Sequence, residues 1–423
     1  MNCKNFILKK QLTFMDYLDL YKELLDFSFE RRRVLVEHDV NVDLLHVIDE
    51  KGLRKALSSF QRGYDDNKVV TEMIDRIIEI ASTSGGEIMI DDHRESFNNF
   101  KPFLQKNSKR ILFTLGGNAG NASIALARLG ADPFISTAIR NDKYGRWIKA
   151  YLEENQVHTD LLSILEGNRE EAMTYGVEIP GKDRGFLNDS SDVREFKPPD
   201  IEDRSFDCVL LLGLHKLKYG FDSTLDFSKK MHQKSIMISD GGDYSSLSSK
   251  NMECLLEIFR EMDLCCMNEN ELKYCLNALG IGPKEEKRFE DVLENGISFK
   301  EALGLNTLNI HTEFYSFDIL EDRVAVLPTL EPQKIVVKTG IGDGYVAGNV
   351  FGFLQDGKDL VERSLRGLAL GNTTALIKLE RGDFPPMKEL KRREMKIKEI
   401  GEKMIRDFIK ESRMDENELI IRI

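Results

Sequence analysis

The sequence predicts an α/β protein with a doubly wound, mainly parallel sheet flanked by helices and a smaller inserted α/β lid subdomain. Short apolar runs alternate with helical patterns along most of the 423 residues. This alternation favours parallel strands joined by crossover helices. Two stretches, at about 45–108 and 165–205, interrupt it. We expect both to be insertions at one edge of the sheet, where they would act as a lid that excludes water.

The expected strands are the apolar runs of this alternation. They lie at 34–40, 111–115, 133–139, 208–214, 235–240, 263–268, 307–311 and 323–327. A further apolar run, 334–337, is the expected strand before a glycine-rich turn. Residues 1–32 are an expected helical extension with Tyr17 and Tyr21 on its apolar face, and one domain would span 33–423.

Composition restricts the classes of partner. The formal net charge is −12 and the pI about 5.3, which argues against a nucleic-acid-binding surface. No apolar run is long enough to span a membrane. The six cysteines form no C-x-x-C pair, so we expect reduced thiols and a cytoplasmic location. The expected partners are small molecules, with no nucleic acid and no membrane, and the sequence leaves the oligomeric state open.

The stretch KTGIGDGYVAG, residues 338–348, joins an apolar run to a helical pattern through a glycine-rich turn. One interpretation makes Asp343 a helix N-cap, since aspartate is a favoured cap. The other makes it a base inside an anion site built by Gly340 and Gly342. Glycines let backbone N–H groups converge on phosphate oxygens, and the positive end of a helix favours negative charge.

Two polar turns follow expected strands in the first third of the chain. Their polar and glycine residues are Asn41, Asp43, Gly116, Gly117, Asn118 and Asn121. Glycines at a strand-to-helix turn let a ligand approach the backbone, and amides beside them can bond to hydroxyl groups. A tight turn with helix caps is the alternative explanation.

A fourth polar turn, MNENEL at 267–272, places Asn268 and Glu271 in the first turn of an expected helix. A carboxylate there can hold a hydrated Mg²⁺ through water, because that ion keeps several of its waters. A capping box explains the same two residues.

All four turns are expected at the carboxyl ends of parallel strands, the edge where doubly wound sheets bind ligands. Capping alone explains four polar turns on one edge poorly. The arrangement predicts phosphoryl transfer to a polyhydroxylated small molecule. Asp343 would accept the proton of the attacking hydroxyl, while the N–H groups of Gly340 to Asp343 would stabilise the transferred group.

These residues resemble the signatures of the ribokinase-like superfamily of sugar and nucleoside kinases. GGNAGNASIALARLGADPFISTAIRNDKYG, residues 116–145, is similar to the N-terminal signature, and VVKTGIGDGYVAG, residues 336–348, to the later one. The resemblance covers about 33–385. Within the superfamily the chain is most similar to the archaeal ADP-dependent glucokinases and phosphofructokinases. The features that carry this are VEHDVNVDLL at 36–45, the long helical insertion and NIHTEFYSFDI at 309–319.

The resemblance implies phosphoryl transfer from ADP, with Mg²⁺ and a closing lid, and it implies roles for particular residues. Substrate hydroxyls would be bound by Asn41, Asp43, Gly116, Gly117, Asn118 and Asn121. The nucleotide would meet Asn268, His311, Thr339, Gly340 and Gly342. Asp240, Glu271 and Asp343 would organise the metal and its waters. Asp343, Gly340 and Gly342 would be catalytic.

Donor and acceptor stay open at this point. The ADP-dependent group usually carries an H-x-E motif before N-x-x-E, and here MISDGGD places Asp240 at the glutamate position with no histidine. An ATP-dependent sugar or nucleoside kinase is one alternative, and a non-catalytic sugar-phosphate-binding relative is another. Glucose, fructose 6-phosphate and ribose 1-phosphate are all expected acceptors. The candidate partners for a substrate phosphate are Arg140, Lys182, Arg184 and Arg194. Lys338 would face the nucleotide phosphates or would only flank the expected strand.

Overall fold

The computed structural model describes residues 14–63, 68–82, 86–90, 93–166, 173–180, 182, 184–189, 196–201, 203–217, 219–285, 288–411 and 420–422. The helices are α1 (Phe14–Leu25), α2 (Glu50–Gln61), α3 (Lys68–Ser82), α4 (Arg94–Asn107), α5 (Asn118–Leu129), α6 (Lys143–Glu154), α7 (Phe221–Met231), α8 (Ser249–Arg260), α9 (Glu269–Ala278), α10 (Phe289–Leu303), α11 (Ile341–Phe353), α12 (Leu360–Arg381), α13 (Met387–Leu390) and α14 (Glu399–Glu411). Among these described segments, no helix is both long and apolar enough to cross a lipid bilayer.

The main sheet has ten strands in the described part of the chain, and most of them are parallel. Its order is β15 (Ile420–Arg422), β14 (Arg323–Pro328), β13 (Tyr315–Ile319), β12 (Thr307–His311), β11 (Leu264–Met267), β10 (Ile236–Asp240), β9 (Cys208–Leu212), β1 (Arg33–His38), β5 (Asp132–Arg140) and β6 (Ser163–Leu165). The strands from β6 to β12 are parallel, and β13 to β15 run antiparallel to their neighbours. The strand order reverses around β1, so the carboxyl end of β1 is the switch point where such sheets bind ligands.

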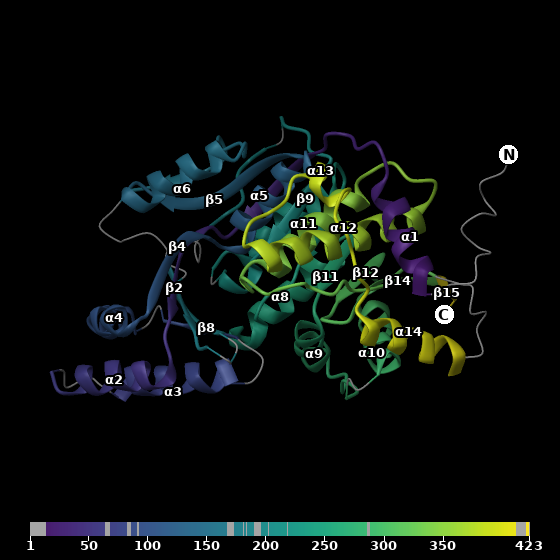
Figure 1. The fold of residues 1–423 in the computed structure, drawn as a ribbon. Helices are drawn as coiled ribbons and strands as arrows, with labels where there is room; N and C mark the ends of the chain where they lie inside the picture. The colour runs from purple at the N-terminus through teal and green to yellow at the C-terminus, as the bar shows by residue number, and fades with distance from the viewer. Residues whose placement is uncertain are drawn as a thin grey trace.

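Helices cover both faces of this sheet (Figure 1). On β1, Val34 and Val36 pack into the core under α5, α11 and α12, while Leu35 packs into the core under α7, α8 and α10. This alternation of buried residues on both faces is what a parallel sheet between two helical layers requires. The expected α/β fold class with a mainly parallel sheet is therefore confirmed.

A second sheet of five strands forms the centre of a smaller lobe, which also contains α2, α3 and α4 (Figure 1). Its order is β3 (Gly86–Met89), β8 (Arg184–Asp189), β7 (Met173–Glu178), β2 (Asn41–Val47) and β4 (Arg110–Gly116). Both expected insertions contribute strands to it. The helices bury its outer side, with Phe97 of α4 against Tyr175 of β7 at a ring distance of 4.7 Å.

The predicted strand at 334–337 was wrong, whereas the predicted strands at 34–40 and 111–115 exist but differ from the prediction in their end or their sheet. The run 34–40 ends earlier, because β1 stops at His38 and Asn41 already begins β2 of the smaller lobe. The run 111–115 is β4, which pairs antiparallel with β2 and does not belong to the main sheet. The run 334–337 forms no strand, and its Ile335 and Val336 side chains are 59% and 55% exposed.

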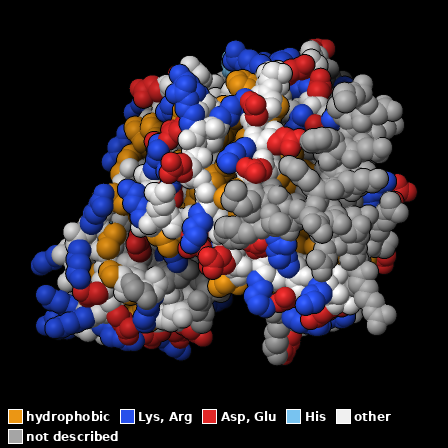
Figure 2. Space-filling view, turned by 45° about the vertical axis from the view of Figure 1, so that its right-hand side comes forward, with side chains coloured by type: hydrophobic (Ala, Val, Ile, Leu, Met, Phe, Trp, Pro, Cys, Tyr) orange, Lys and Arg blue, Asp and Glu red, His pale blue; other side chains and the backbone are white. Residues whose placement is uncertain are grey.

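Other expectations agree with the structure. Tyr17 and Tyr21 of α1 are buried, although residues 1–13 of the expected extension lie outside the described residues. The five cysteines in the described ranges are free thiols. On the face drawn in Figure 2, acidic side chains lie among basic ones.

Candidate active site

Asp39 directly follows β1 at the switch point, and its carboxylate contacts the start of α5 and the segment after β9. Its Oδ1 accepts hydrogen bonds from the backbone N–H groups of Asn118 (3.0 Å) and Ala119 (3.4 Å), so it holds the N-terminus of α5. Its Oδ2 lies 2.6 Å from Nζ of Lys216, which follows β9, and both side chains are buried. The buried ion pair fixes the floor of the site at the carboxyl edge of the sheet.

Asp343 lies on this floor at the start of α11. The N-cap of that helix is Gly340, with a φ of +74° and no side-chain cap bond, so the N-cap interpretation of Asp343 is wrong. The carboxylate instead accepts hydrogen bonds from the side-chain amides of Asn118 and Asn121, each at 2.9 Å. Burial, reinforced by the negative charge of Asp39, raises the pKa of Asp343 to about 7.

A cavity of about 220 Å³ lies between this floor and the smaller lobe. Its floor includes Gly117, Asn118, Asn121, Lys216, Gly340 and Asp343. Its roof is a row of polar side chains on neighbouring strands, since Asp43 pairs with Thr174 across β2 and β7, and Thr174 with Asn188 across β7 and β8. Strand pairing thus presents carboxylate, hydroxyl and amide groups to a ligand that carries hydroxyls.

Neighbouring charges shift the pKa values of two carboxyl groups that line this cavity. Glu87 of β3 lies 3.3 Å from Nε2 of His215 and accepts a hydrogen bond from the Asn188 amide. Burial alone would raise the pKa of Glu87, but the His215 contact and the positive charge of Lys216 outweigh it and hold that pKa well below its usual value. Burial raises the pKa of Asp43 to about 7, against the opposing effect of Lys216.

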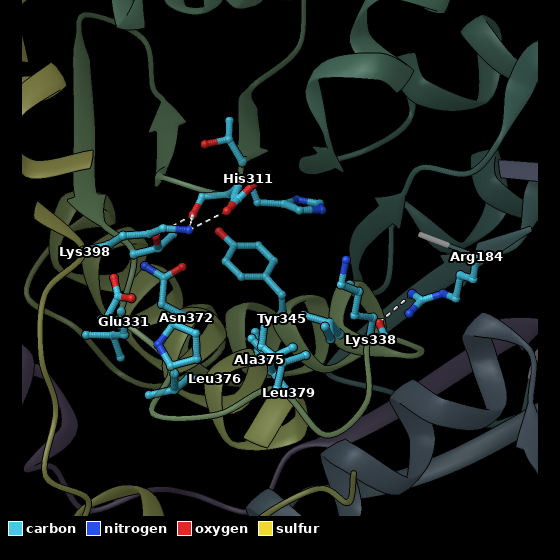
Figure 3. Close-up of a pocket in the computed structure, with 18 of the residues that line it drawn as sticks. Arg184, His311, Glu331, Lys338, Tyr345, Asn372, Ala375, Leu376, Leu379 and Lys398 are labelled. Atoms are coloured by element: carbon cyan, nitrogen blue, oxygen red, sulfur yellow. Dashed lines mark hydrogen bonds and ion pairs between the residues drawn. The ribbon is translucent and has the colours of Figure 1, made fainter. Parts of the chain in front are cut away.

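A larger cavity of about 760 Å³ adjoins the first on the other side of the Gly340–Asp343 turn (Figure 3). The His311 and Tyr345 rings stack on its wall with centroids 4.6 Å apart, and Figure 3 shows Tyr345 near the centre of the labelled residues. Its apolar lining includes Leu330, Pro332, Ile335, Ala375, Leu376 and Leu379. An aromatic pair with aliphatic neighbours is a surface on which a flat, uncharged ring can pack.

Arg184 and Lys338 line both cavities. The Arg184 guanidinium on β8 donates a 2.6 Å hydrogen bond to the backbone carbonyl of Lys338, the contact drawn in Figure 3. Two cations at the junction of two cavities, beside the first N–H groups of α11, form a suitable place for phosphate groups.

Asn268 and Glu271 form the capping box that the sequence also allowed. The Asn268 side chain accepts from the N–H groups of Asn270 and Glu271, and Glu271 accepts from the N–H of Asn268 at 2.8 Å. Neither residue lines the two cavities. No group of three potential metal ligands occurs in the described ranges.

Asp240 nevertheless lies near two other carboxyl groups, those of Glu271 and Asp343. Its Oδ1 is buried without a partner, and burial, with the charges of Glu271 and Asp343, raises the pKa of Asp240 well above its usual value. A divalent cation would relieve this repulsion. The residues therefore fit a hydrated Mg²⁺ held through water more readily than an ion enclosed by protein ligands.

Comparison with known proteins identifies the family. A family model described as pfkB family carbohydrate kinase matches residues 83–382. This chain belongs to the pfkB family of carbohydrate kinases. Among curated proteins, the pfkB chain is 20% identical to a 5-dehydro-2-deoxygluconokinase from Clostridium tetani over 350 residues, 80% of this chain and 95% of the relative. It is 22% identical to a nucleoside kinase from Methanocaldococcus jannaschii over 259 residues, 60% of this chain and 76% of the relative.

Two solved structures share the fold of this pfkB kinase. A ribokinase from Cryptococcus neoformans in complex with ADP has a TM-score of 0.61 at 17% identity, covering 86% of this chain and 100% of that one. Arabidopsis thaliana ribokinase complexed with ribose and ATP has a TM-score of 0.60 at 15% identity, with the same coverage of both chains. The ribokinase-like fold class is confirmed. These four relatives are a 5-dehydro-2-deoxygluconokinase, a nucleoside kinase and two ribokinases, and none of them is described as ADP-dependent.

The structure brings most of the predicted site residues of the kinase together. Those that line one of the two cavities are Asp43, Gly117, Asn118, Asn121, His311, Thr339, Gly340, Gly342 and Asp343. Asn41 lies behind the cavity wall, where its amide donates to Asp43 at 3.1 Å and to Thr174. Gly116 ends β4 opposite Asn41.

Only some of the cations predicted to bind phosphate groups lie at the two cavities. Arg184 and Lys338 reach the site, as described above. Arg140 donates to the carbonyl of Glu166 at 3.1 Å, Lys182 contacts Glu50 at 3.1 Å, and neither lines a cavity. Arg194 lies outside the described residues. Sequence reasoning missed other cavity residues, namely Glu87, Thr174, Phe186, Asn188 and Lys216.

We expect Gly116→Ala to displace Asp43. A methyl group at this position would overlap the Asp43 carboxylate, which lines the smaller cavity. Because small displacements of positioning groups strongly affect catalysis, kcat/KM for the acceptor should fall roughly 10- to 100-fold. Steady-state kinetics with varied acceptor measure this. Gly282→Ala is the matched control, since a methyl group there meets no atom within 4 Å. An unchanged kcat/KM in Gly116→Ala would show that Asp43 does not position the acceptor.

Proposed function

We propose that this pfkB-family kinase transfers the terminal phosphoryl group of ATP to a hydroxyl group of a sugar or nucleoside. The observation that carries the proposal is the placement of Asp343. Its carboxylate is held by two asparagine amides at the boundary between a small polar cavity and a larger, partly apolar one. The smaller cavity would hold the acceptor and the larger one the nucleotide.

In this arrangement Asp343 accepts the proton of the attacking hydroxyl group. The first N–H groups of α11 have no acceptor within the helix, and they stabilise the charge on the transferred phosphoryl group. Arg184 and Lys338 neutralise nucleotide phosphates at the junction. Asp240 and Glu271 would hold Mg²⁺ through water, and the bound ion would neutralise charge on the phosphates.

The charges of the smaller cavity favour an acceptor without a phosphate group. Three carboxylates, Asp43, Glu87 and Asp343, line it, and two of its three cations, Arg184 and Lys338, lie at the junction where the nucleotide phosphates are proposed to bind. Its buried Lys216 already lies 2.6 Å from Asp39. Hydroxyl groups can donate to carboxylates, whereas a phosphate dianion would be repelled. We therefore favour a free sugar or a nucleoside over fructose 6-phosphate or ribose 1-phosphate.

ATP is the favoured donor for two reasons. The solved ribokinase from Arabidopsis thaliana carries ribose and ATP, and Asp240 stands alone where the ADP-dependent group has H-x-E. One observation favours ADP instead. The helices α2, α3 and α4 of the smaller lobe form the long insertion that resembles the ADP-dependent sugar kinases.

A donor-by-acceptor assay tests the proposal. Purified protein with Mg²⁺ is given ATP or ADP, together with ribose, fructose, glucose, nucleosides, fructose 6-phosphate or ribose 1-phosphate. We expect acceptor-dependent ADP release from ATP with an unphosphorylated acceptor. AMP release from ADP alone would assign the other donor. Turnover only with a sugar phosphate would contradict the charge argument. Acceptor binding without turnover under either nucleotide would support a non-catalytic protein.

A further inference from the structure

The N-terminal helix α1 lies outside the segment that the family model matches, residues 83–382. It packs against α12 beside β14, on the side of the molecule away from the smaller lobe (Figure 1). Its Tyr21 side chain is completely buried. The hydroxyl group of a buried tyrosine usually finds a hydrogen-bond partner, and the partners of the Tyr21 hydroxyl show what this helix is attached to.

The Tyr21 hydroxyl joins three elements. It donates a 2.7 Å hydrogen bond to the carbonyl of Pro328, at the end of β14. It accepts a 2.7 Å hydrogen bond from the side-chain amide of Asn372, in the middle of α12. The same amide lies 3.0 Å from the hydroxyl of Ser316 on β13. The Asn372 side chain is thus held between α1 and the antiparallel edge of the main sheet.

Asn372 is also part of the wall of the larger cavity, together with Tyr345 (Figure 3). The Tyr345 hydroxyl accepts a 3.0 Å hydrogen bond from the amide of Asn309. Buried hydrogen bonds thus hold both Tyr345 and Asn372 in this part of the cavity wall. Removing one partner from such a network leaves a buried group unsatisfied and lets its neighbours move.

We infer that Tyr21 is a positioning residue for nucleotide binding: through Asn372, the helix α1 sets the shape of the nucleotide cavity. The inference rests on the proposed function, which assigns the larger cavity to the nucleotide. Tyr21 itself does not line that cavity and touches neither reactant. Its effect should therefore appear in nucleotide affinity and not in the chemical step.

Isothermal titration calorimetry of the full chain with ATP and Mg²⁺, without acceptor, is the test. Tyr21→Phe keeps the ring and removes the hydroxyl, and we expect about 5-fold weaker ATP binding, a fraction of the cost of a lost buried hydrogen bond. In turnover assays the KM for ATP should rise by a similar factor, while kcat and the acceptor KM stay near the native values.

Tyr17→Phe is the matched control. Tyr17 lies one turn earlier on α1 and is 1% exposed, and its hydroxyl makes no hydrogen bond within the described part of the chain. This variant should bind ATP as the native protein does. If both variants weaken binding equally, or if Tyr21→Phe binds normally, the inference is wrong.

A double-mutant cycle shows whether Tyr21 acts through Asn372. In an Asn372→Ala background, adding Tyr21→Phe should leave ATP affinity unchanged, because the group that Tyr21 positions is already absent. Additive losses would overturn the inference while leaving the proposed function intact. Failure of the native protein to bind any nucleotide would overturn both.

Discussion

Replacing Asp343 with asparagine should lower kcat by about 10²-fold or more, the range expected when a general base is lost. Asparagine has nearly the shape of aspartate, and the acceptor is held by other groups around the smaller cavity, so the acceptor KM should change little. The measurement is steady-state kinetics on the donor and acceptor pair that the assay identifies. If kcat of this variant stays within about 3-fold of the native value, Asp343 is not the general base.

The pH profile adds a second readout of the same residue. Burial raises the pKa of Asp343 to about 7, so at lower pH more of the carboxyl group is protonated and unable to accept a proton. Activity should therefore rise as the pH increases through about 7, and Asp343→Asn should lose this dependence. Glu37→Gln is the control, because burial also raises the pKa of Glu37, to about 8, although it lines neither cavity. It should retain both the rate and the profile.

Lys216→Met should cause the largest loss of stability, about 3 kcal/mol or more in the free energy of unfolding. The change leaves Asp39 charged and buried, and it removes a positive charge close to Glu87 and Asp43. The Asp39 backbone and carboxylate also hold the N-terminus of α5, so that helix should lose its fixed position. Urea unfolding followed by circular dichroism measures the loss.

Lys22→Met provides the comparison for an exposed ion pair. Lys22 lies 3.1 Å from Asp19 on α1, and the two side chains are 67% and 57% exposed. Such pairs contribute little, so this variant should unfold near the native urea concentration. The double variant Asp39→Asn/Lys216→Met should be more stable than Lys216→Met alone, because residue 39 then carries no buried charge that lacks its partner. If Lys216→Met itself unfolds like the native protein, the buried pair does not hold the floor of the site.

The motif residues of the site could be predicted from the sequence because each motif is local. Gly340 to Asp343 and Gly117 to Asn121 are contiguous turns that can be read from the sequence. They meet because α5 and α11 pack against each other, and not because both follow parallel strands, since β4 belongs to the smaller sheet and 334–337 is no strand. Glu87, Asn188 and Lys216 could not be found in this way. Each is a single polar residue in or after a short strand, and only the pairing of strands distant in sequence brings it to the cavity.

Two strand errors have physical causes that periodicity does not show. The stretch from Val34 to Val47 contains no glycine or proline, so no such residue marks the change of sheet after His38. The run 334–337 is apolar for a different reason. Its Ile335 lines the larger cavity, so apolarity there serves a ligand surface and not a buried strand.

The strand β8 has a consequence for the kinetics of the enzyme. Arg184 and Phe186 of this one strand line both cavities, so a displacement of β8 away from the body would open the two compartments together. Closure would likewise enclose both reactants at once. If β8 is displaced when no acceptor is bound, a bound nucleotide would remain exposed to solvent and would lack its contact with Arg184. Wasteful hydrolysis of the donor should accordingly be slow compared with transfer.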